Sequence, residues 1–240
     1  MRAFLLILSF FTRIPVGHRV EYSDELYETS IKYFPYIGMV IGLLCMVPYV
    51  LFKNVNSSIV SVLVILAYLI VTGGIHLDGL ADSMDGLFSN RDRERVLEIM
   101  KDSRIGSFGV IGLILYFLIF YTTVKELPPV FIFLMPFVGK SSGAFAAGFT
   151  GYARKTPGMG TVFVESHNMA TSGGITVACL AISYLLAGSS GVLAGGLTLV
   201  LAYLMMKWIE GKIGGMTGDT IGFVVEVCQV AFLLISVIVY

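Results

Sequence analysis

Three aspartates in the stretch from Gly73 to Gly86 have the spacing of one helix face: Asp78, Asp82 and Asp85. Positions i, i+4 and i+7 fall within about 60° of one another, because each helical residue advances by ~100°. Like charges with this spacing repel, whereas Mg²⁺ takes oxygen ligands and commonly bridges carboxylates to substrate phosphates. The pattern therefore predicts a magnesium site. The alternative is a solvated acidic helix end, which the apolar and small neighbouring residues disfavour.

Cations, hydroxyls and glycines precede a long apolar stretch in the segment from Lys101 to Gly109. Lys101, Arg104 and Ser107 would lie at the N-terminus of the next helix, where free N–H groups and nearby cations favour an anion such as phosphate. Anchoring at the membrane surface is the alternative. A second cationic segment, Tyr152 to Gly160, contains Arg154.

Two carboxylates stand near the C-terminus at a spacing of i, i+7: Asp219 and Glu226. On a helix they share one face, with Glu226 about 10 Å further along at 1.5 Å per residue. A carboxylate inside a membrane helix is a functional hypothesis by default. Asp219 has two roles open to it, as the N-cap of the helix or as a metal or substrate ligand.

Two further polar residues lie within or beside apolar stretches. Lys140 would lie within hydrocarbon and therefore needs a partner, a polar cavity or a route to the surface. His76 falls on the opposite face from the aspartates, which favours a structural hydrogen bond over a ligand role. No Ser-His-Asp elbow, Walker loop or HExxH motif occurs, so phosphoryl or nucleotidyl chemistry on a diphosphate fits these residues best.

The composition indicates that membrane helices must position these residues. The 240 residues are 56% hydrophobic and 13% charged, with a mean hydropathy of +0.86; soluble domains carry about 25% charged residues. The 16 basic and 16 acidic residues cancel, which argues against nucleic-acid binding. We therefore expect an all-α, polytopic membrane bundle forming a single domain over residues 1–240.

Seven apolar segments are each close to the ~20 residues that cross a bilayer. They are Tyr33–Phe52, Ser58–Leu77, Ser107–Thr123, Pro128–Phe149, Thr171–Ala187, Gly191–Ile209 and Thr220–Tyr240. The turn residues from Gly188 to Gly191 predict a tight hairpin between two of them. Ala3 to Phe11 is too short to span and is interpreted as an interfacial or re-entrant helix.

Basic residues are distributed unevenly between alternate loops. Thirteen of the 16 Lys and Arg residues fall on one side, two on the other and one, Lys140, inside a span. Because basic residues accumulate on the cytoplasmic side, we expect a multi-pass protein of the cytoplasmic membrane. Its N-terminus and candidate site would face the cytoplasm, and its C-terminus would lie outside.

At these residues the sequence resembles the cobalamin synthase, or adenosylcobinamide-GDP ribazoletransferase, family. The matching blocks run through almost the whole chain: Phe11–Pro15, Gly74–Asp82 with Asp85 and Gly86, Leu97–Gly106 continuing to Phe108 and Gly109, Tyr152–Arg154, and Thr217–Thr220 with Glu226. One departure is Lys140, where the family more often has Arg, and this weakens any claim of a bidentate phosphate contact there.

The resemblance implies an Mg²⁺-dependent transfer. The alcohol of α-ribazole, or of its 5′-phosphate, would attack the cobinamide-side phosphorus of adenosylcobinamide-GDP and expel GMP. It implies a protein in the lipid bilayer, and it is compatible with a homo-oligomer and with association with other corrinoid-pathway enzymes.

The site residues follow from the same resemblance as hypotheses. Asp78, Asp82 and Asp85 would hold Mg²⁺ and the diphosphate, with Asp82 or Asp85 as the base, and Asp219 would complete the metal site. The proposed substrate contacts are Lys101, Arg104, Ser107, Arg154 and, behind Asp219, Glu226.

Other functional classes remain open from the sequence. A CDP-alcohol phosphotransferase or a prenyltransferase also uses aspartates on membrane helices, although with different spacings. A cation-coupled transporter should show inverted repeats and polar groups near the midplane, and the one-sided charge clustering argues against it. A scaffold subunit that anchors other corrinoid enzymes would tolerate loss of the three aspartates.

Overall fold

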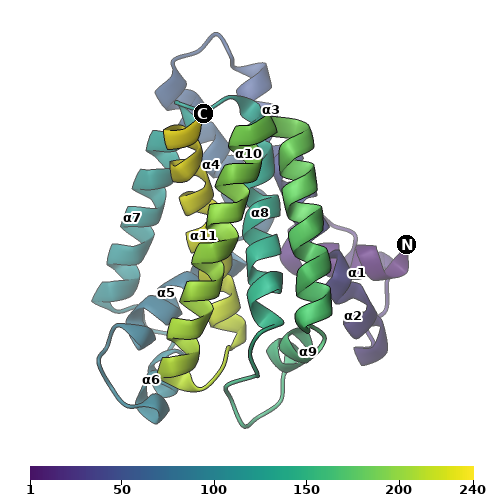
Figure 1. Ribbon diagram of the computed structural model, residues 1–240, viewed down its shortest axis with the longest axis vertical. Helices are drawn as coiled ribbons and strands as arrows, with labels where there is room; N and C mark the ends of the chain where they lie inside the picture. Colours follow the sequence, from purple (N-terminus) through teal and green to yellow (C-terminus); the bar gives the residue numbers. More distant parts are fainter.

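A computed structural model describes residues 1–240, with the exception of the Arg19 side chain. The chain is helical throughout (Figure 1), which confirms the expected all-α class. The α-helices are α1 (Arg2–Phe11), α2 (Asp24–Ser30), α3 (Phe34–Leu51), α4 (Ser57–Thr72), α5 (Ile75–Leu87), α6 (Arg93–Ile99), α7 (Ser107–Val124), α8 (Pro129–Ala147), α9 (Met159–Glu165), α10 (Met169–Ile213) and α11 (Gly218–Val239).

The predicted spans correspond to long apolar helices. Five segments are long and apolar enough to cross a membrane, and the bent pair α4–α5 brings the number to six. The 45-residue α10 reverses at Gly188, which has φ 62° and ψ −148°. Its two halves lie side by side, since a Cβ on Gly195 would lie 3.3 Å from Oγ of Ser183. The hairpin expected between the fifth and sixth spans is therefore present (Figure 1).

The second span ends earlier than the sequence predicted. α4 stops at Thr72, and Gly73 and Gly74 both take left-handed conformations, with φ of 63° and 73°. Glycine adopts this conformation without a steric penalty, and two such residues in succession end a helix. The chain turns by 94° before α5 begins. The expectation that one helix continues to Leu77 is wrong, and the three aspartates lie on the separate helix α5.

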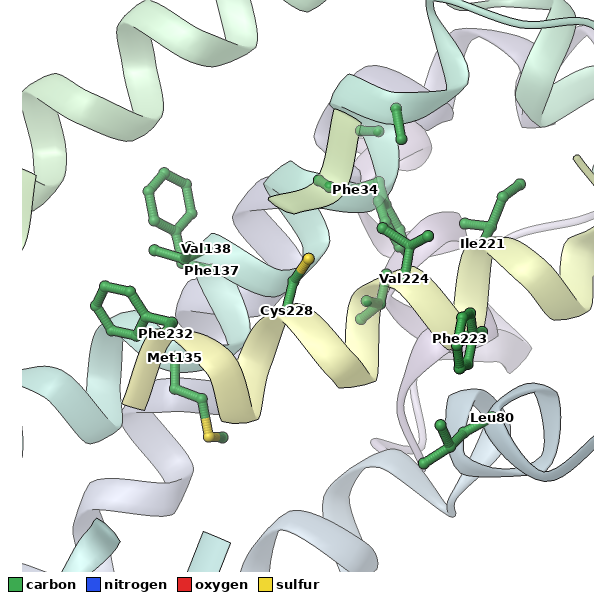
Figure 2. Packing of buried hydrophobic residues seen from close by; sticks show 14 of the residues in the cluster. Phe34, Leu80, Met135, Phe137, Val138, Ile221, Phe223, Val224, Cys228 and Phe232 are labelled. Carbon is green, nitrogen blue, oxygen red and sulfur yellow. The ribbon is translucent and has the colours of Figure 1, made fainter. Parts of the chain in front are cut away.

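The core of the bundle is formed by α8 and α11. Both are mostly buried, whereas α7 and α10 expose most of their apolar surface, as expected for helices in contact with lipid. Val224, Cys228 and Phe232 follow one another along α11 and pack against neighbouring helices (Figure 2). α11 contacts α5, α7, α8 and α10, so residues on α11 lie at the centre of the molecule.

Glycines on α3 allow it to approach α8 closely. A Cβ atom on Gly38 would collide with the backbone of Pro136 and Phe137, and one on Gly42 would collide with that of Phe133. The spacing of these two glycines is the small-xxx-small pattern that lets membrane helices pack backbone to backbone. α1 packs against α3 as well.

Candidate active site

α5 and α11 cross in close contact, and this crossing brings together carboxylates from distant parts of the sequence. A Cβ atom on Gly79 would lie only 2.7 Å from the backbone oxygen of Asp219. Glycine at this position therefore lets the two backbones meet. As a result, α5, which carries Asp78 and Asp82, lies directly beside the first turn of α11.

Asp82 is half-buried among these carboxylates. It lies on α5, beyond the bend that ends the spanning helix α4. Burial, followed by the negative charges of Asp78, Asp219 and Asp85, raises the pKa of Asp82 to about 6. The four aspartates of the predicted acidic site thus act on one another electrostatically.

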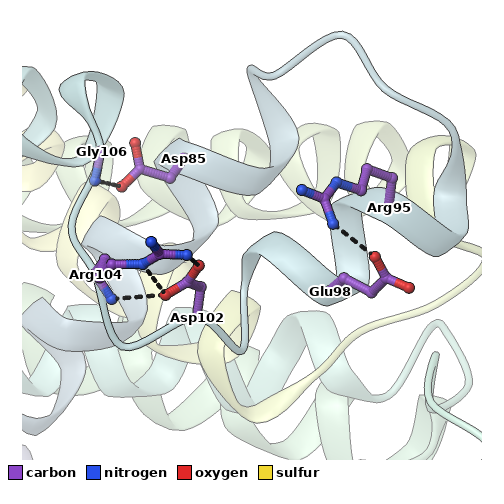
Figure 3. A network of polar contacts seen from close by, with 6 residues as sticks. All are labelled: Asp85, Arg95, Glu98, Asp102, Arg104 and Gly106. Carbon is purple, nitrogen blue, oxygen red and sulfur yellow. Dashed lines mark hydrogen bonds and ion pairs between the residues drawn. The ribbon is translucent and has the colours of Figure 1, made fainter.

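Asp85 connects α5 to the start of α7. Its Oδ2 accepts a hydrogen bond from the backbone N–H of Gly106 at 2.6 Å (Figure 3). Its Oδ1 accepts one from the backbone N–H of Gly109 at 2.9 Å. These are among the N–H groups that a helix leaves unpaired at its beginning. Asp85 therefore caps α7 from a neighbouring helix. Its assignment as metal ligand or base stays a prediction, and the structure gives both oxygens another partner.

Asp219 is paired with Arg154. Its Oδ2 accepts a hydrogen bond from Nη2 of Arg154 at 2.7 Å. The Arg154 loop is held beside α11 by the backbone, because the N–H of Ala153 donates to the carbonyl of Met216 at 2.8 Å. The sequence left open whether Asp219 is the helix cap. The cap is Thr217, whose Oγ1 accepts from the N–H of Thr220 at 3.2 Å, so Asp219 is free of that role.

The predicted phosphate-binding residues between α6 and α7 lie on the surface. Lys101 and Ser107 are exposed, and the Arg104 side chain is 86% exposed. Arg104 binds Asp102 through two hydrogen bonds, of 3.0 Å from Nε and 2.7 Å from Nη2 (Figure 3). These bonds lower the pKa of Asp102 to about 2. The loop is joined to the acidic helix through the Asp85 cap, so its cations stand at the edge of the acidic site.

Glu226 lies inside the bundle, where its side chain is 1% exposed. Its Oε1 accepts a hydrogen bond from the hydroxyl of Tyr68 at 2.6 Å and lies 4.0 Å from Nδ1 of His76. The same Nδ1 is 3.4 Å from Nζ of Lys140, which is fully buried. Lys140 therefore has partners within the bundle and does not reach the surface. His76 has polar partners inside the bundle, as the sequence favoured.

The sequence reasoning missed two features of this region. Tyr68 and Gln229 complete the buried network, with Nε2 of Gln229 donating to the Tyr68 hydroxyl at 2.9 Å. Beside the acidic residues lies a cavity of about 280 Å³ with several aromatic rings in its wall. The sequence does not show which aromatic residues of an apolar stretch line a cavity and which belong to an ordinary core. Of the motif blocks named above, Phe11–Pro15 contributes Phe11 to the wall of this cavity.

The donor groups suit a hard cation only in part. Among the described residues, no three His, Cys, Asp or Glu side chains are arranged to hold a metal ion by themselves. Asp85 is engaged by the start of α7, and one oxygen of Asp219 by Arg154. The remaining oxygen donors are those of Asp78 and Asp82 and the second oxygen of Asp219.

Comparison with known families decides where this arrangement belongs. The model of the family described as cobalamin-5-phosphate synthase matches residues 3–237 of the chain. The chain belongs to this family. Three of the five motif blocks that carry the resemblance lie on α5, on α6 with its connection to α7, and on α11, and a fourth, Tyr152–Arg154, lies in the loop that brings Arg154 to the acidic site. The remaining block, Phe11–Pro15, begins at the end of α1.

Full-length relatives agree with this membership of the cobalamin-5-phosphate synthase family. An adenosylcobinamide-GDP ribazoletransferase of Alkaliphilus oremlandii is 39% identical, covering 98% of this chain and 96% of the relative. Proteins with the same name from Acetivibrio thermocellus and Fusobacterium nucleatum are each 36% identical over at least 97% of both chains. No solved structure matches the chain significantly.

Proposed function

We propose that this protein transfers the adenosylcobinamide phosphate group of adenosylcobinamide-GDP to α-ribazole or to its 5′-phosphate, with release of GMP. Membership of the cobalamin-5-phosphate synthase family and likeness over almost the whole chain to named ribazoletransferases support this activity. The structural observation that carries it is the half-buried Asp82, surrounded by Asp78, Asp85 and Asp219 at the crossing of α5 and α11.

The cofactor proposed for this site is Mg²⁺. Mg²⁺ is usually bound through one or two carboxylates together with substrate phosphates, and dedicated all-protein cages are uncommon. The oxygens of Asp78 and Asp82, with the second oxygen of Asp219, fit that mode, and the diphosphate would supply further oxygens. When bound, Mg²⁺ would neutralise charge that develops on the phosphoryl oxygens.

Asp82 is the proposed general base. The ribazole hydroxyl attacks the cobinamide-side phosphorus, the bond from that phosphorus to the bridging oxygen breaks, and GMP leaves. The hydroxyl proton passes to the Asp82 carboxylate. A base works best when its pKa lies near the operating pH, and burial with the neighbouring negative charges moves Asp82 in that direction.

The remaining residues position the substrate. Arg154 is held beside the acidic site by Asp219, where its guanidinium can bind phosphate oxygens. Lys101, Arg104 and Ser107 offer cations and a hydroxyl at the edge for the leaving nucleotide. Asp85 fixes this edge to α5 through Gly106 and Gly109. Glu226 supports the site from within the bundle and does not contact substrate in this proposal.

The proposed topology places the N-terminus and the site in the cytoplasm and the C-terminus outside, with residues 1–240 as one domain. The asymmetric distribution of Lys and Arg supports this orientation. Cysteine-labelling with a membrane-impermeant reagent tests it in a protein whose three buried native cysteines have been replaced. We expect labelling from outside at position 126 and not at position 155.

The activity is tested with purified protein in lipid, adenosylcobinamide-GDP, α-ribazole and Mg²⁺, following GMP and the cobalamin product by mass. We expect both products from the wild type and neither without metal. A folded protein that forms no cobalamin but transfers the phosphoalcohol group of a CDP-alcohol to a second alcohol, with release of CMP, would overturn the proposal in favour of a phospholipid-type enzyme.

A further inference from the structure

The cavity beside the acidic site has two kinds of wall. Asp78, Asp219 and His76 are its charged or polar lining residues, and aromatic rings form much of the rest, among them Phe34 and Phe163. Its volume is about 280 Å³, just below the ~300–1,000 Å³ range of pockets for drug-sized ligands. A space of this size holds a small ring system and excludes a corrinoid or a whole dinucleotide.

The aromatic rings are fixed by one another. Phe34 is fully buried and packs edge-to-face against Phe11 at 4.7 Å and against Phe163 at 5.0 Å between ring centroids. Phe11 in turn stacks on His76 at 5.2 Å with an interplanar angle of 29°. Phe34 has no exposed surface of its own, and it holds the rings of Phe11 and Phe163 in fixed positions in the cavity wall. A preformed aromatic wall favours a flat aromatic ligand.

His76 brings a polar ring to the cavity wall. Its Nδ1 faces Nζ of Lys140 at 3.4 Å. A lysine ammonium can only donate, so Nδ1 accepts and the proton of the neutral imidazole is on Nε2. A neutral imidazole in this wall can pair with one ring nitrogen of a ligand.

We propose that this cavity binds the benzimidazole ring of the riboside substrate and thereby presents its ribose to the acidic site. The inference rests on the proposed transferase function. A benzimidazole riboside has one free ring nitrogen and otherwise apolar edges. Guanine carries several donors and acceptors on its edges, and the aromatic part of this wall would leave unpaired those that face it. The guanine of the other substrate is therefore assigned to the exposed cationic edge.

The first test replaces one residue of the cavity wall, Phe163→Leu, and measures KM for each of the two substrates. We expect KM for α-ribazole to rise about two- to twelvefold, the range that an aromatic contact of about 0.5–1.5 kcal/mol predicts, with KM for adenosylcobinamide-GDP unchanged within about twofold. Phe149→Leu is the matched control, because Phe149 packs against Phe145 and Tyr203 outside the cavity. It should leave both KM values unchanged.

The second test varies the size of the base in the riboside substrate, because a folding defect would not change the preference between two ribosides. Phe163→Leu widens the cavity, so the ratio of kcat/KM for a riboside of a tricyclic naphthimidazole to that for α-ribazole should increase at least about threefold. A variant that is simply less folded loses activity toward both ribosides equally and leaves this ratio unchanged.

Three outcomes separate the possibilities. An unchanged KM and an unchanged ratio in a folded Phe163→Leu protein would overturn the cavity assignment while leaving the transferase function intact. Weaker inhibition by GMP with unchanged KM for α-ribazole would assign the cavity to guanine and also overturn it. If the wild type forms no product, the proposed function fails, and equilibrium dialysis of α-ribazole against wild type and Phe163→Leu then decides the cavity assignment alone.

Discussion

Two groups of charged or polar residues lie on and beside α5, and they differ in how far solvent reaches them. The acidic site has carboxylates that are half-buried or exposed, with Arg154 beside them. The network of Glu226, Lys140 and His76 lies inside the bundle, where Glu226 and Lys140 are buried and His76 lines the cavity. A carboxylate that substrate can reach can take part in chemistry. A carboxylate of the same type that is enclosed by Tyr68 and Lys140 instead holds helices together.

The largest expected effect is on the acidic site. Asp82→Asn keeps the size of the side chain but cannot accept the hydroxyl proton. We expect kcat to fall by about 10²–10⁴-fold, the range for loss of a general base, with little change in stability. Steady-state assays with saturating Mg²⁺ measure this. Near-normal turnover would contradict the role given to Asp82.

The matched control for this variant is Glu126→Gln. Glu126 follows the C-terminal end of α7, about 27 Å along the helix from Ser107 at 1.5 Å per residue, and its side chain is exposed. The Glu126→Gln variant should keep the kcat and the stability of the wild type. A loss of activity in this variant would indicate a general sensitivity to charge and would weaken the conclusion from Asp82→Asn.

The next largest effect is expected in the buried network of Glu226, Lys140 and His76, as a decrease in the free energy of unfolding. Glu226→Ala leaves the Tyr68 hydroxyl without its acceptor in the interior, and a buried polar group left unpaired costs about 1–3 kcal/mol. Unfolding in mixed detergent should show this loss, whereas kcat per folded molecule should change by less than about tenfold. The double variant Glu226→Leu with Lys140→Met should recover part of the lost stability.

A smaller effect is expected where Asp85 joins α5 to the loop that precedes α7. Asp85→Ala leaves the N–H groups of Gly106 and Gly109 unpaired, which should cost about 1–2 kcal/mol, as for loss of a helix cap. Hydrogen exchange at the first turn of α7 should increase. Unchanged exchange in this turn would contradict the capping role.

The smallest effect is expected at the surface. Arg104→Ala removes an exposed cation whose pair with Asp102 contributes little to stability. We expect KM for adenosylcobinamide-GDP to rise by about two- to fivefold at low salt, and by less at high salt, because exposed charges are screened. An effect that does not depend on salt would argue against an electrostatic contact with the nucleotide.

The sequence predicted the spans and the acidic face because both depend on local patterns. Apolar runs of bilayer length identify membrane helices, and α5 carries Asp78, Asp82 and Asp85 as the helical spacing required. The bend at Gly73 and Gly74 was missed because two adjacent glycines inside an apolar stretch are compatible with a continuous helix.

Features that depend on distant contacts were beyond such patterns. The hydroxyl of Tyr68 meets Glu226 across 158 positions of the chain, and no local spacing relates the two. The role of Asp85 depends on the loop that begins at Gly106, which the helix arithmetic did not include. The aromatic cavity draws on α1, α2, α3, α5, α9 and α11, so only the assembled bundle shows it.

The most direct test of this account is the Mg²⁺ dependence of GMP release in three proteins: wild type, Asp78→Asn and Glu226→Gln. We expect Asp78→Asn to need at least about tenfold more Mg²⁺ for half-maximal rate, as for loss of a metal-site contact, and Glu226→Gln to match the wild type. The opposite result, with the Mg²⁺ requirement unchanged in Asp78→Asn and raised in Glu226→Gln, would place the metal in the buried network and contradict the account.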